Sequence, residues 1–201
     1  MIKHTFVHEP GALDLFQDTT TLLSFKNKLS KLSASLPEIN PVQWGRKSKE
    51  ENENVIKGKG FELFCELLVS LMGHHPHIGL TKYEPCQIKD NGIDAFAVNL
   101  NNEKSAVQCK FRSDANYEFT EGSSNLGSFM TEALFETDCK KKSSVKKAFL
   151  ITTAKGINYS TASKWRNSVF EINGKTLKTL VNNNIIFWNS CCELINESRG
   201  K

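Results

Sequence analysis

The sequence has no long hydrophobic run and no amino-terminal secretion signal. None of its apolar segments approaches the ~20 residues that a membrane-spanning helix needs. Its first residues, MIKHTFVHEPGALD, lack the apolar stretch of a signal peptide. These absences predict a protein that is neither secreted nor embedded in a membrane, and we expect it in the cytoplasm.

Paired metal ligands at zinc-site spacing are also missing. The six cysteines show no CxxC spacing and lie mostly in apolar segments, so we interpret them as reduced core residues. A redox pair of the adjacent Cys191 and Cys192 is the less favoured alternative. His74, His75 and His77 cluster in HHPH, but no second ligand pair stands nearby at zinc-like spacing. We interpret HHPH as a polar loop.

Acidic residues are scarce in one stretch of the chain. Residues 139–178 contain ten Lys and Arg but only one acid, Glu171, which gives a local charge of +9; since the whole chain carries +4, the rest carries −5. Such an asymmetry indicates a surface that faces a polyanion. The alternative is an ordinary solvated face.

What is present fits one folded core with an appendage. The chain has 201 residues, of which 39% are hydrophobic and 24% charged. Apolar periodicity predicts helices and strands in an order typical of an α/β protein with a mixed sheet flanked by helices. The predicted helices are 11–36 (with a break near 19–21 and an end at Pro37 and Pro41), 58–73 (capped by Gly73), 125–142 and 158–170. The predicted strands are 78–89 (an edge or bulged strand because of Pro85), 93–100, 104–112, 147–153 and 185–188. Residues 45–57 are expected to be a connector or the first turns of the next helix.

The most informative stretch is Asn91–Arg112, NGIDAFAVNLNNEKSAVQCKFR. It predicts two strands around an Asn-rich turn, with Asp94 early on the first strand. Gln108 and Lys110 lie two residues apart on the second strand and therefore share a face. An acid, an amide oxygen and a lysine at one sheet edge can hold a divalent cation beside a phosphate. The alternative is that all three are ordinary polar strand residues.

The length of the turn decides whether these side chains can meet. A two-residue turn at Asn101–Asn102 would place Asp94 opposite Cys109. Because opposed residues share a face, Asp94 would then point away from Gln108 and Lys110. A shared site therefore requires a loop of three or five residues, or a bulge.

Three short motifs in order resemble the PD-(D/E)xK nuclease superfamily. They are GxxFE on a helix (Gly58, Phe61, Glu62), GID ending at Asp94, and VQCK ending at Lys110. The resemblance is closest to the Mrr-like restriction endonuclease branch, in which Gln replaces the second acid. It covers about residues 53–190 and implies a restriction-endonuclease-like αβββαβ core. We therefore expect an N-terminal helical extension over 1–52 and a nuclease domain over 53–201. The motif's usual proline is replaced by Ile93.

The resemblance implies a role for each motif residue. Asp94 would be the central ligand of a metal ion, joined by the Gln108 side-chain oxygen, the Cys109 backbone carbonyl and Glu62, the last directly or through water. Lys110 would position the attacking water or stabilise charge on the phosphate. The cofactor would be Mg²⁺, with Mn²⁺ as a substitute, and the reaction would be hydrolysis of DNA phosphodiester bonds.

The resemblance also implies partners. DNA would be the substrate, in restriction and defence, recombination or repair, and a homodimer or a helicase partner or fusion is expected. Thr152 and Thr153 lie where this branch often has a polar residue; the alternative is that they are ordinary buried strand residues. The candidate DNA-contacting residues are Arg112, Lys140, Lys141, Lys142, Lys146 and Lys147. A surface salt bridge is the alternative for Arg112. Trp165 and Trp188 are expected in the core. The alternative function is a non-catalytic nucleic-acid- or protein-binding module that keeps the nuclease fold.

Overall fold

The computed structural model describes residues 1–39, 48–90, 92–122, 124–135, 145, 147–163 and 165–200. They form two compact units: Met1–Leu67 together with Leu177–Lys201, and Leu68–Thr176. The boundary between the units falls within helix α3 (Lys49–Met72), which includes the predicted helix at 58–73. The functional division expected between residues 52 and 53 stays a prediction.

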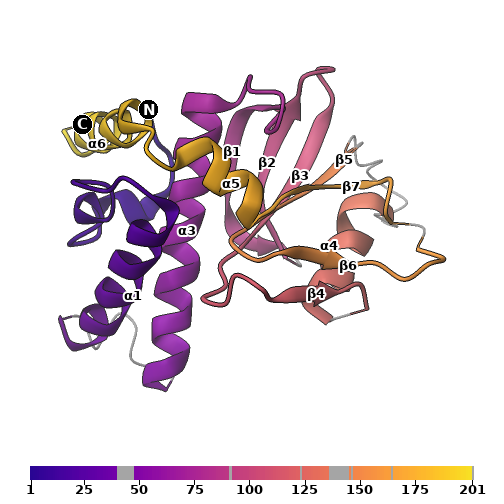
Figure 1. Ribbon diagram of the computed structural model, residues 1–201, viewed down its shortest axis with the longest axis horizontal. Helices are drawn as coiled ribbons and strands as arrows, with labels where there is room; N and C mark the ends of the chain where they lie inside the picture. The colour runs from indigo at the N-terminus through magenta and orange to yellow at the C-terminus, as the bar shows by residue number, and fades with distance from the viewer. Residues whose placement is uncertain are drawn as a thin grey trace. The chain divides into compact units, whose positions relative to one another are not determined.

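The unit Leu68–Thr176 contains a mixed five-stranded sheet (Figure 1). β1 (Leu80–Asp90), β2 (Ile93–Asn99) and β3 (Lys104–Lys110) pair antiparallel. β5 (Lys147–Thr152) pairs parallel with β3, and β7 (Val169–Ile172) pairs parallel with β5. With α3 before the sheet and α4 (Ser124–Phe135) between β3 and β5, the element order confirms the αβββαβ core.

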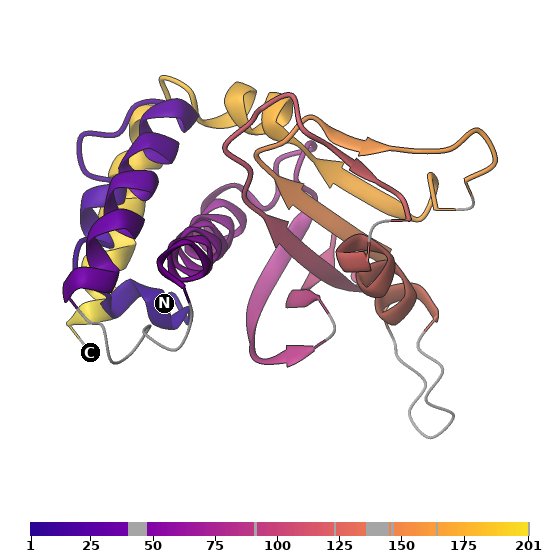
Figure 2. The same ribbon diagram turned by 90° about the horizontal axis from the view of Figure 1, so that it is seen from below.

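The core of this unit lies between the sheet and α4. Leu126, Phe129 and Met130 of α4 pack with Ala106 of β3 and Leu150 of β5. Figure 2 shows α4 against one face of the sheet. Because side chains alternate along a strand, the residues of β3 that face α4 are the even-numbered ones. Gln108 and Lys110 therefore follow Ala106 on this face.

The edge strand β1 tolerates Pro85 as predicted. Its pairing with β2 shifts register between Thr81 and Glu84 and again between Pro85 and Asp90. A proline lacks the N–H that a central strand needs, so it is accommodated at an irregular edge. The described ranges contain no helix long and apolar enough to cross a membrane.

Gly73 is not the left-handed helix cap that the sequence predicts. The positive φ lies at Gly79, at 64°, whereas Gly73 is absent from the positive-φ positions. A Cβ on Gly73 would collide with the carbonyl oxygens of Leu80 and Val69. The Leu80 N–H also donates to the Gly73 carbonyl at 3.0 Å. Gly73 is therefore required by the close approach of β1 to the end of α3.

The unit formed by both chain ends is helical. It holds the short 3-10 helices η1 (Thr5–His8) and η2 (Leu13–Leu15), and α1 (Leu22–Ile39) and α6 (Ile185–Arg199). α5 (Gly174–Val181) ends in it. The predicted break near residues 19–21 is confirmed. The predicted end at Pro37 is wrong, because α1 continues to Ile39.

An aromatic cluster forms the core of this helical unit. The Phe25 ring lies 4.8 Å from the Phe64 ring and 6.2 Å from the Trp188 ring, centroid to centroid. Phe16 and Phe187 complete the cluster. Trp188 is 1% exposed, so its predicted place in a core is confirmed.

Two predicted elements are wrong, and three short strands and the helix α5 were not predicted. The described residues of 158–170 form no helix; β6 (Gly156–Asn158) and the start of β7 occupy the ends of this range. Residues 185–188 begin α6 instead of forming a strand, because Asn184 caps the helix by accepting the Phe187 N–H. β4 (Glu118–Thr120) pairs with β6 in a second, two-stranded sheet.

Candidate active site

The β2–β3 hairpin has an odd-numbered loop, as a shared site requires. Val98 pairs with Lys104, and the Asn99 N–H donates to the Glu103 carbonyl at 2.9 Å, which leaves a loop of Leu100, Asn101 and Asn102. The Asn99 side-chain oxygen accepts the N–H groups of Asn101 and Glu103. Asn102 takes the left-handed conformation with φ of 59°. The predicted loop parity is confirmed.

This register places Asp94 and Gln108 on one face. Ala95 pairs with Val107, so the next positions along the ladder are Asp94 and Gln108. Directly opposed residues share a face, and Lys110 follows Gln108 by two residues on the same face. The structure therefore brings Asp94, Gln108 and Lys110 to one end of the central strands.

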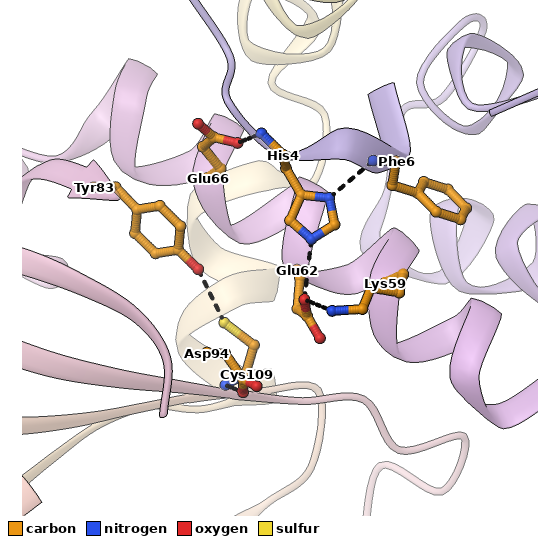
Figure 3. A network of polar contacts seen from close by, with 8 residues as sticks. All are labelled: His4, Phe6, Lys59, Glu62, Glu66, Tyr83, Asp94 and Cys109. Atoms are coloured by element: carbon orange, nitrogen blue, oxygen red, sulfur yellow. Dashed lines mark hydrogen bonds and ion pairs between the residues drawn. The ribbon is translucent and has the colours of Figure 1, made fainter. Parts of the chain in front are cut away.

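Asp94 is fixed by the backbone of β3. Its Oδ2 accepts the Cys109 N–H at 2.7 Å (Figure 3). In an extended strand the N–H and C=O of one residue point to the same side. The Cys109 carbonyl therefore lies on the Asp94 side of β3, as the expected backbone ligand must. The Cys109 thiol lies on the other face, 3.3 Å from the Tyr83 hydroxyl.

Gln108 is more deeply buried than Asp94 and Lys110. The side chain is 0% exposed, and its Nε2 donates to the Gly92 carbonyl at 2.9 Å. This bond ties the start of β2 to β3. Lys110 and Asp94 are only partly buried, so both can meet a substrate from solvent. Gln108 is therefore less accessible to solvent than Asp94 and Lys110.

Two buried threonines, Thr152 at the end of β5 and Thr153 directly after it, support the strand end that carries Lys110. Thr152 Oγ1 donates to the Lys110 carbonyl at 2.7 Å and accepts the Ala154 N–H at 3.1 Å. Thr153 Oγ1 donates to the Arg112 carbonyl at 2.7 Å and accepts the Arg112 N–H at 2.7 Å. These hydroxyls extend the β3–β5 ladder beyond its last backbone pair.

Glu62 belongs to the helical unit, where the amino-terminal segment contacts it. His4 Nε2 lies 3.0 Å from Glu62 Oε2, and the Lys59 ammonium lies 2.7 Å from the same oxygen (Figure 3). Because His4 Nδ1 accepts the Phe6 N–H, Nε2 carries the ring proton and donates to Glu62. One turn further along α3, Glu66 accepts the N–H groups of Lys3 and His4.

The two glutamates have opposite pKa shifts. Burial acts to raise the pKa of Glu62, but the hydrogen bond from His4 and the charge of Lys59 outweigh it, so the pKa is lowered. Burial raises the pKa of Glu66, and the N–H groups of Lys3 and His4 offset this only in part. The fold thus favours the ionised form of Glu62 and disfavours that of Glu66.

Sequence reasoning missed the contact between His4 and Glu62. The two residues are 58 positions apart, and no local motif joins them. Only the apolar residues Ile2 and Phe6, which are buried on either side of His4, indicate that MIKHTF is anchored to the fold.

Of the five candidate DNA-contacting lysines between residues 140 and 147, the structure describes only Lys147. Lys140, Lys141, Lys142 and Lys146 lie outside the described residues. Lys147 begins β5 and pairs with Ser105, whereas Lys110 pairs with Thr152 at the other end of the same ladder. Five residues of strand span about 16 Å. The structure therefore does not bring Lys147 to the end of the sheet where Asp94 and Lys110 lie.

The candidate metal-ligand atoms of Asp94, Gln108 and Cys109 are all oxygens. A carboxylate, an amide oxygen and a main-chain carbonyl suit a hard divalent cation that retains several waters. Within the described ranges, no three His, Cys, Asp or Glu side chains cluster as a metal site. The candidate set at β2 and β3 has a different composition, with a single carboxylate.

Comparison with known proteins identifies the family of the chain. A family model described as "Restriction endonuclease" matches residues 77–193, more than half of the chain. The chain belongs to the restriction endonuclease family. This membership confirms the resemblance to Mrr-like PD-(D/E)xK nucleases. The matched range contains Asp94, Gln108 and Lys110 and begins after Glu62. Neither the curated proteins nor the solved structures gave a match.

Proposed function

We propose that this restriction endonuclease family member is a metal-dependent DNA endonuclease that hydrolyses phosphodiester bonds. The observation that carries the proposal is the three-residue hairpin loop, since it places Asp94, Gln108 and Lys110 on one face. A loop of even length would have separated them. The family match over the same strands supports the nuclease assignment.

Each residue of this end of the sheet has a proposed role. Asp94, the Gln108 side-chain oxygen and the Cys109 carbonyl would hold Mg²⁺, for which Mn²⁺ would substitute. The ion supplies a lowered pKa for bound water and neutralises charge on the phosphate. The Lys110 ammonium contacts a phosphate oxygen as a point charge. The Cys109 N–H keeps the Asp94 carboxylate in place.

Glu62 is proposed as a further ligand on the strength of the GxxFE motif alone. Because Gln108 carries no charge, a carboxylate from elsewhere would strengthen metal binding. The lowered pKa keeps Glu62 ionised, as a ligand must be.

The biological role and the protein partners stay expectations from the family resemblance. The expected roles are restriction and defence, recombination or repair, and the expected partners are a second copy of the chain or a helicase.

The proposal is tested by incubating supercoiled plasmid with the protein and Mg²⁺ or Mn²⁺. We expect nicking or linearisation by the wild type and at least a ~10²-fold loss in Asp94→Ala and Lys110→Ala. Lys104→Ala is the matched control, because Lys104 lies on the same strand at its far, exposed end. Chelation by EDTA should abolish cleavage by the wild type.

Two outcomes would contradict the enzyme assignment. One is a wild type that binds DNA but leaves every plasmid form intact. The other is cleavage by Asp94→Ala and Lys110→Ala at the wild-type rate. The first outcome would favour a binding module that keeps the nuclease fold.

A further inference from the structure

Arg112 follows Lys110 by two residues, and its backbone is fixed by Thr153, the residue that follows β5. Both its N–H and its C=O bond to the single hydroxyl of Thr153, each at 2.7 Å. Thr153 is 1% exposed, so water does not compete for this hydroxyl. The position of Arg112 is therefore coupled to the strand that also supports Lys110.

The Arg112 guanidinium lies against two aromatic rings, which contact each other edge to face with 5.0 Å between their centroids. The guanidinium carbon is 4.9 Å from the Tyr117 ring centroid and 5.0 Å from the Phe119 ring centroid. Phe119 is buried in the core beneath α4, whereas Tyr117 is 39% exposed. The Lys155 N–H donates to the Tyr117 carbonyl at 3.0 Å and fixes that residue to the β4–β6 sheet. Both rings are thus anchored.

Contact with the two rings leaves part of the guanidinium rim for hydrogen bonds. A planar guanidinium contacts rings through its faces and donates from its rim. One rim donor, Nη1, bonds the Phe111 carbonyl at 2.9 Å. The remaining rim is suited to a phosphate, which guanidinium groups bind with two parallel hydrogen bonds.

No carboxylate among the described residues forms an ion pair with Arg112, and the two nearest in sequence have other partners. Asp114 accepts the Asn116 N–H at 2.8 Å. Glu118 pairs with the Lys155 ammonium at 2.8 Å. The positive charge of Arg112 is therefore not neutralised by either neighbour, and an anionic ligand is the partner that its chemistry fits.

We propose that Arg112, held against Tyr117 and Phe119, binds a DNA backbone phosphate next to the one that Lys110 contacts, and that Thr153 is its positioning residue. The inference rests on the proposed function for the identity of the substrate. It assigns to the β4–β6 sheet a task in DNA binding that the nuclease motifs do not cover. A backbone contact of this kind adds affinity without sequence preference.

DNA binding without divalent metal tests the inference separately from cleavage. Fluorescence anisotropy of a labelled duplex in EDTA, at several salt concentrations, gives the slope of log Kobs against log salt. We expect Arg112→Ala to reduce that slope by about 1. Lys31→Ala, which removes one exposed charge from α1, is the matched control and should leave the slope unchanged.

Thr153 is tested with a matched pair of variants. Thr153→Val removes both hydroxyl bonds while keeping the shape, so the slope should fall part of the way towards that of Arg112→Ala. Thr153→Ser keeps the hydroxyl and should restore the wild-type slope. Thr120→Val, at an exposed position of β4, controls for loss of a hydroxyl. Circular dichroism verifies the fold of each variant.

Three results would overturn the inference: an unchanged slope in Arg112→Ala, an equal reduction in Lys31→Ala, or a wild type that does not bind DNA. A folded Thr153→Val with the wild-type slope would overturn the role of Thr153. A wild type that binds DNA with the expected dependence on Arg112 but never cleaves it would contradict the proposed function and still support this inference.

Discussion

At the scale of single residues, Gln108 differs from the acid that PD-(D/E)xK nucleases usually carry. Its amide nitrogen donates to the Gly92 carbonyl from a fully buried position. A glutamate there would face that carbonyl with an oxygen instead of a donor and would bury a charge. The local environment therefore explains why an amide occupies this position.

This environment predicts the effect of Gln108→Glu. Without metal, the variant should lose about 1–3 kcal/mol in free energy of unfolding, because a buried carbonyl loses its donor. Mg²⁺ should recover part of the loss by binding the new carboxylate. Urea titrations in EDTA and in Mg²⁺ measure both effects. Gln17→Glu, at an exposed position, is the control, and equal stability of Gln108→Glu and wild type in EDTA would contradict the prediction.

The two glutamates of α3 predict opposite pH dependences of stability. The pKa of Glu62 is lowered from 4.5, so its stabilisation is present above pH 4.5 and is lost as the pH falls through the folded-state pKa. The stability gap between wild type and Glu62→Gln should therefore shrink below pH 4.5. The pKa of Glu66 is raised, so its contribution is fully present below pH 4.5 and is lost as the pH rises.

Metal-free urea unfolding of wild type, Glu62→Gln and Glu66→Gln at several pH values measures both gaps. Only their change with pH matters, because each substitution also removes hydrogen bonds. Relative to wild type, Glu66→Gln should gain stability as the pH rises above 4.5. If the difference in free energy of unfolding from wild type changed in the same direction with pH for both variants, the prediction of opposite pH dependences would be contradicted.

At the scale of elements, the length of the β2–β3 loop decides whether Asp94 shares a face with Gln108 and Lys110. Three loop residues keep Asp94 opposite Gln108, and Asn102 supports the turn with a left-handed backbone. Deleting Asn101 would leave two residues and shift the pairing by one position. The deletion would then turn Asp94 to the face opposite Gln108 and Lys110.

We expect the Asn101 deletion to abolish plasmid cleavage while most strand content persists. Inserting two residues after Asn101 keeps the odd parity and should retain cleavage. Plasmid assays and far-ultraviolet circular dichroism compare the two variants with wild type. Wild-type activity in the folded deletion variant would mean that the register does not control the site.

The sequence predicted correctly the elements in which the pattern of apolar residues matches the pattern of burial. The strand predicted at 93–100 alternates between buried and partly buried residues in β2. The odd hairpin loop was predicted from the requirement that Asp94 share a face with Gln108 and Lys110. The run Ile185–Trp188 misled because its β-branched residues indicate a strand. In the fold Ile185 and Ile186 are 62% and 80% exposed, and burial recurs at helical spacing through Phe187, Cys191 and Ile195.

The remaining features depend on contacts between distant residues. β4 and β6 have three residues each and exist because they pair across 38 positions of sequence, as Glu118 does with Gly156. Likewise, His4 reaches Glu62 and Thr153 reaches Arg112 without any local signal. Local periodicity cannot reveal contacts that only the folded chain creates.

At the scale of the whole molecule, both ends of the chain build one helical unit. The Arg199 guanidinium donates to the Val7 carbonyl at 2.7 Å and to the Glu9 carbonyl at 2.9 Å. The Ser198 hydroxyl accepts the Ile2 N–H at 3.1 Å. The segment that carries His4 is therefore held by the last turn of α6, and its order depends on the carboxyl-terminal helix.

This dependence predicts what loss of the Trp188 ring does. Trp188 contacts Phe16, Phe25, Phe64 and Phe187, and its Nε1 donates to the Val181 carbonyl at 2.8 Å. Trp188→Ala should lower the free energy of unfolding by about 3–5 kcal/mol. Ile186→Ala, at a position 80% exposed on the same helix, should change it by less than about 0.5 kcal/mol.

Hydrogen exchange followed by mass spectrometry locates the effect. In Trp188→Ala, peptides from α1 and from residues 1–9 should exchange faster, because both depend on the same aromatic core and on α6. Ile186→Ala should exchange like the wild type. Protection of residues 1–9 that is unchanged in Trp188→Ala would show that the amino-terminal segment is held on α3 without help from α6.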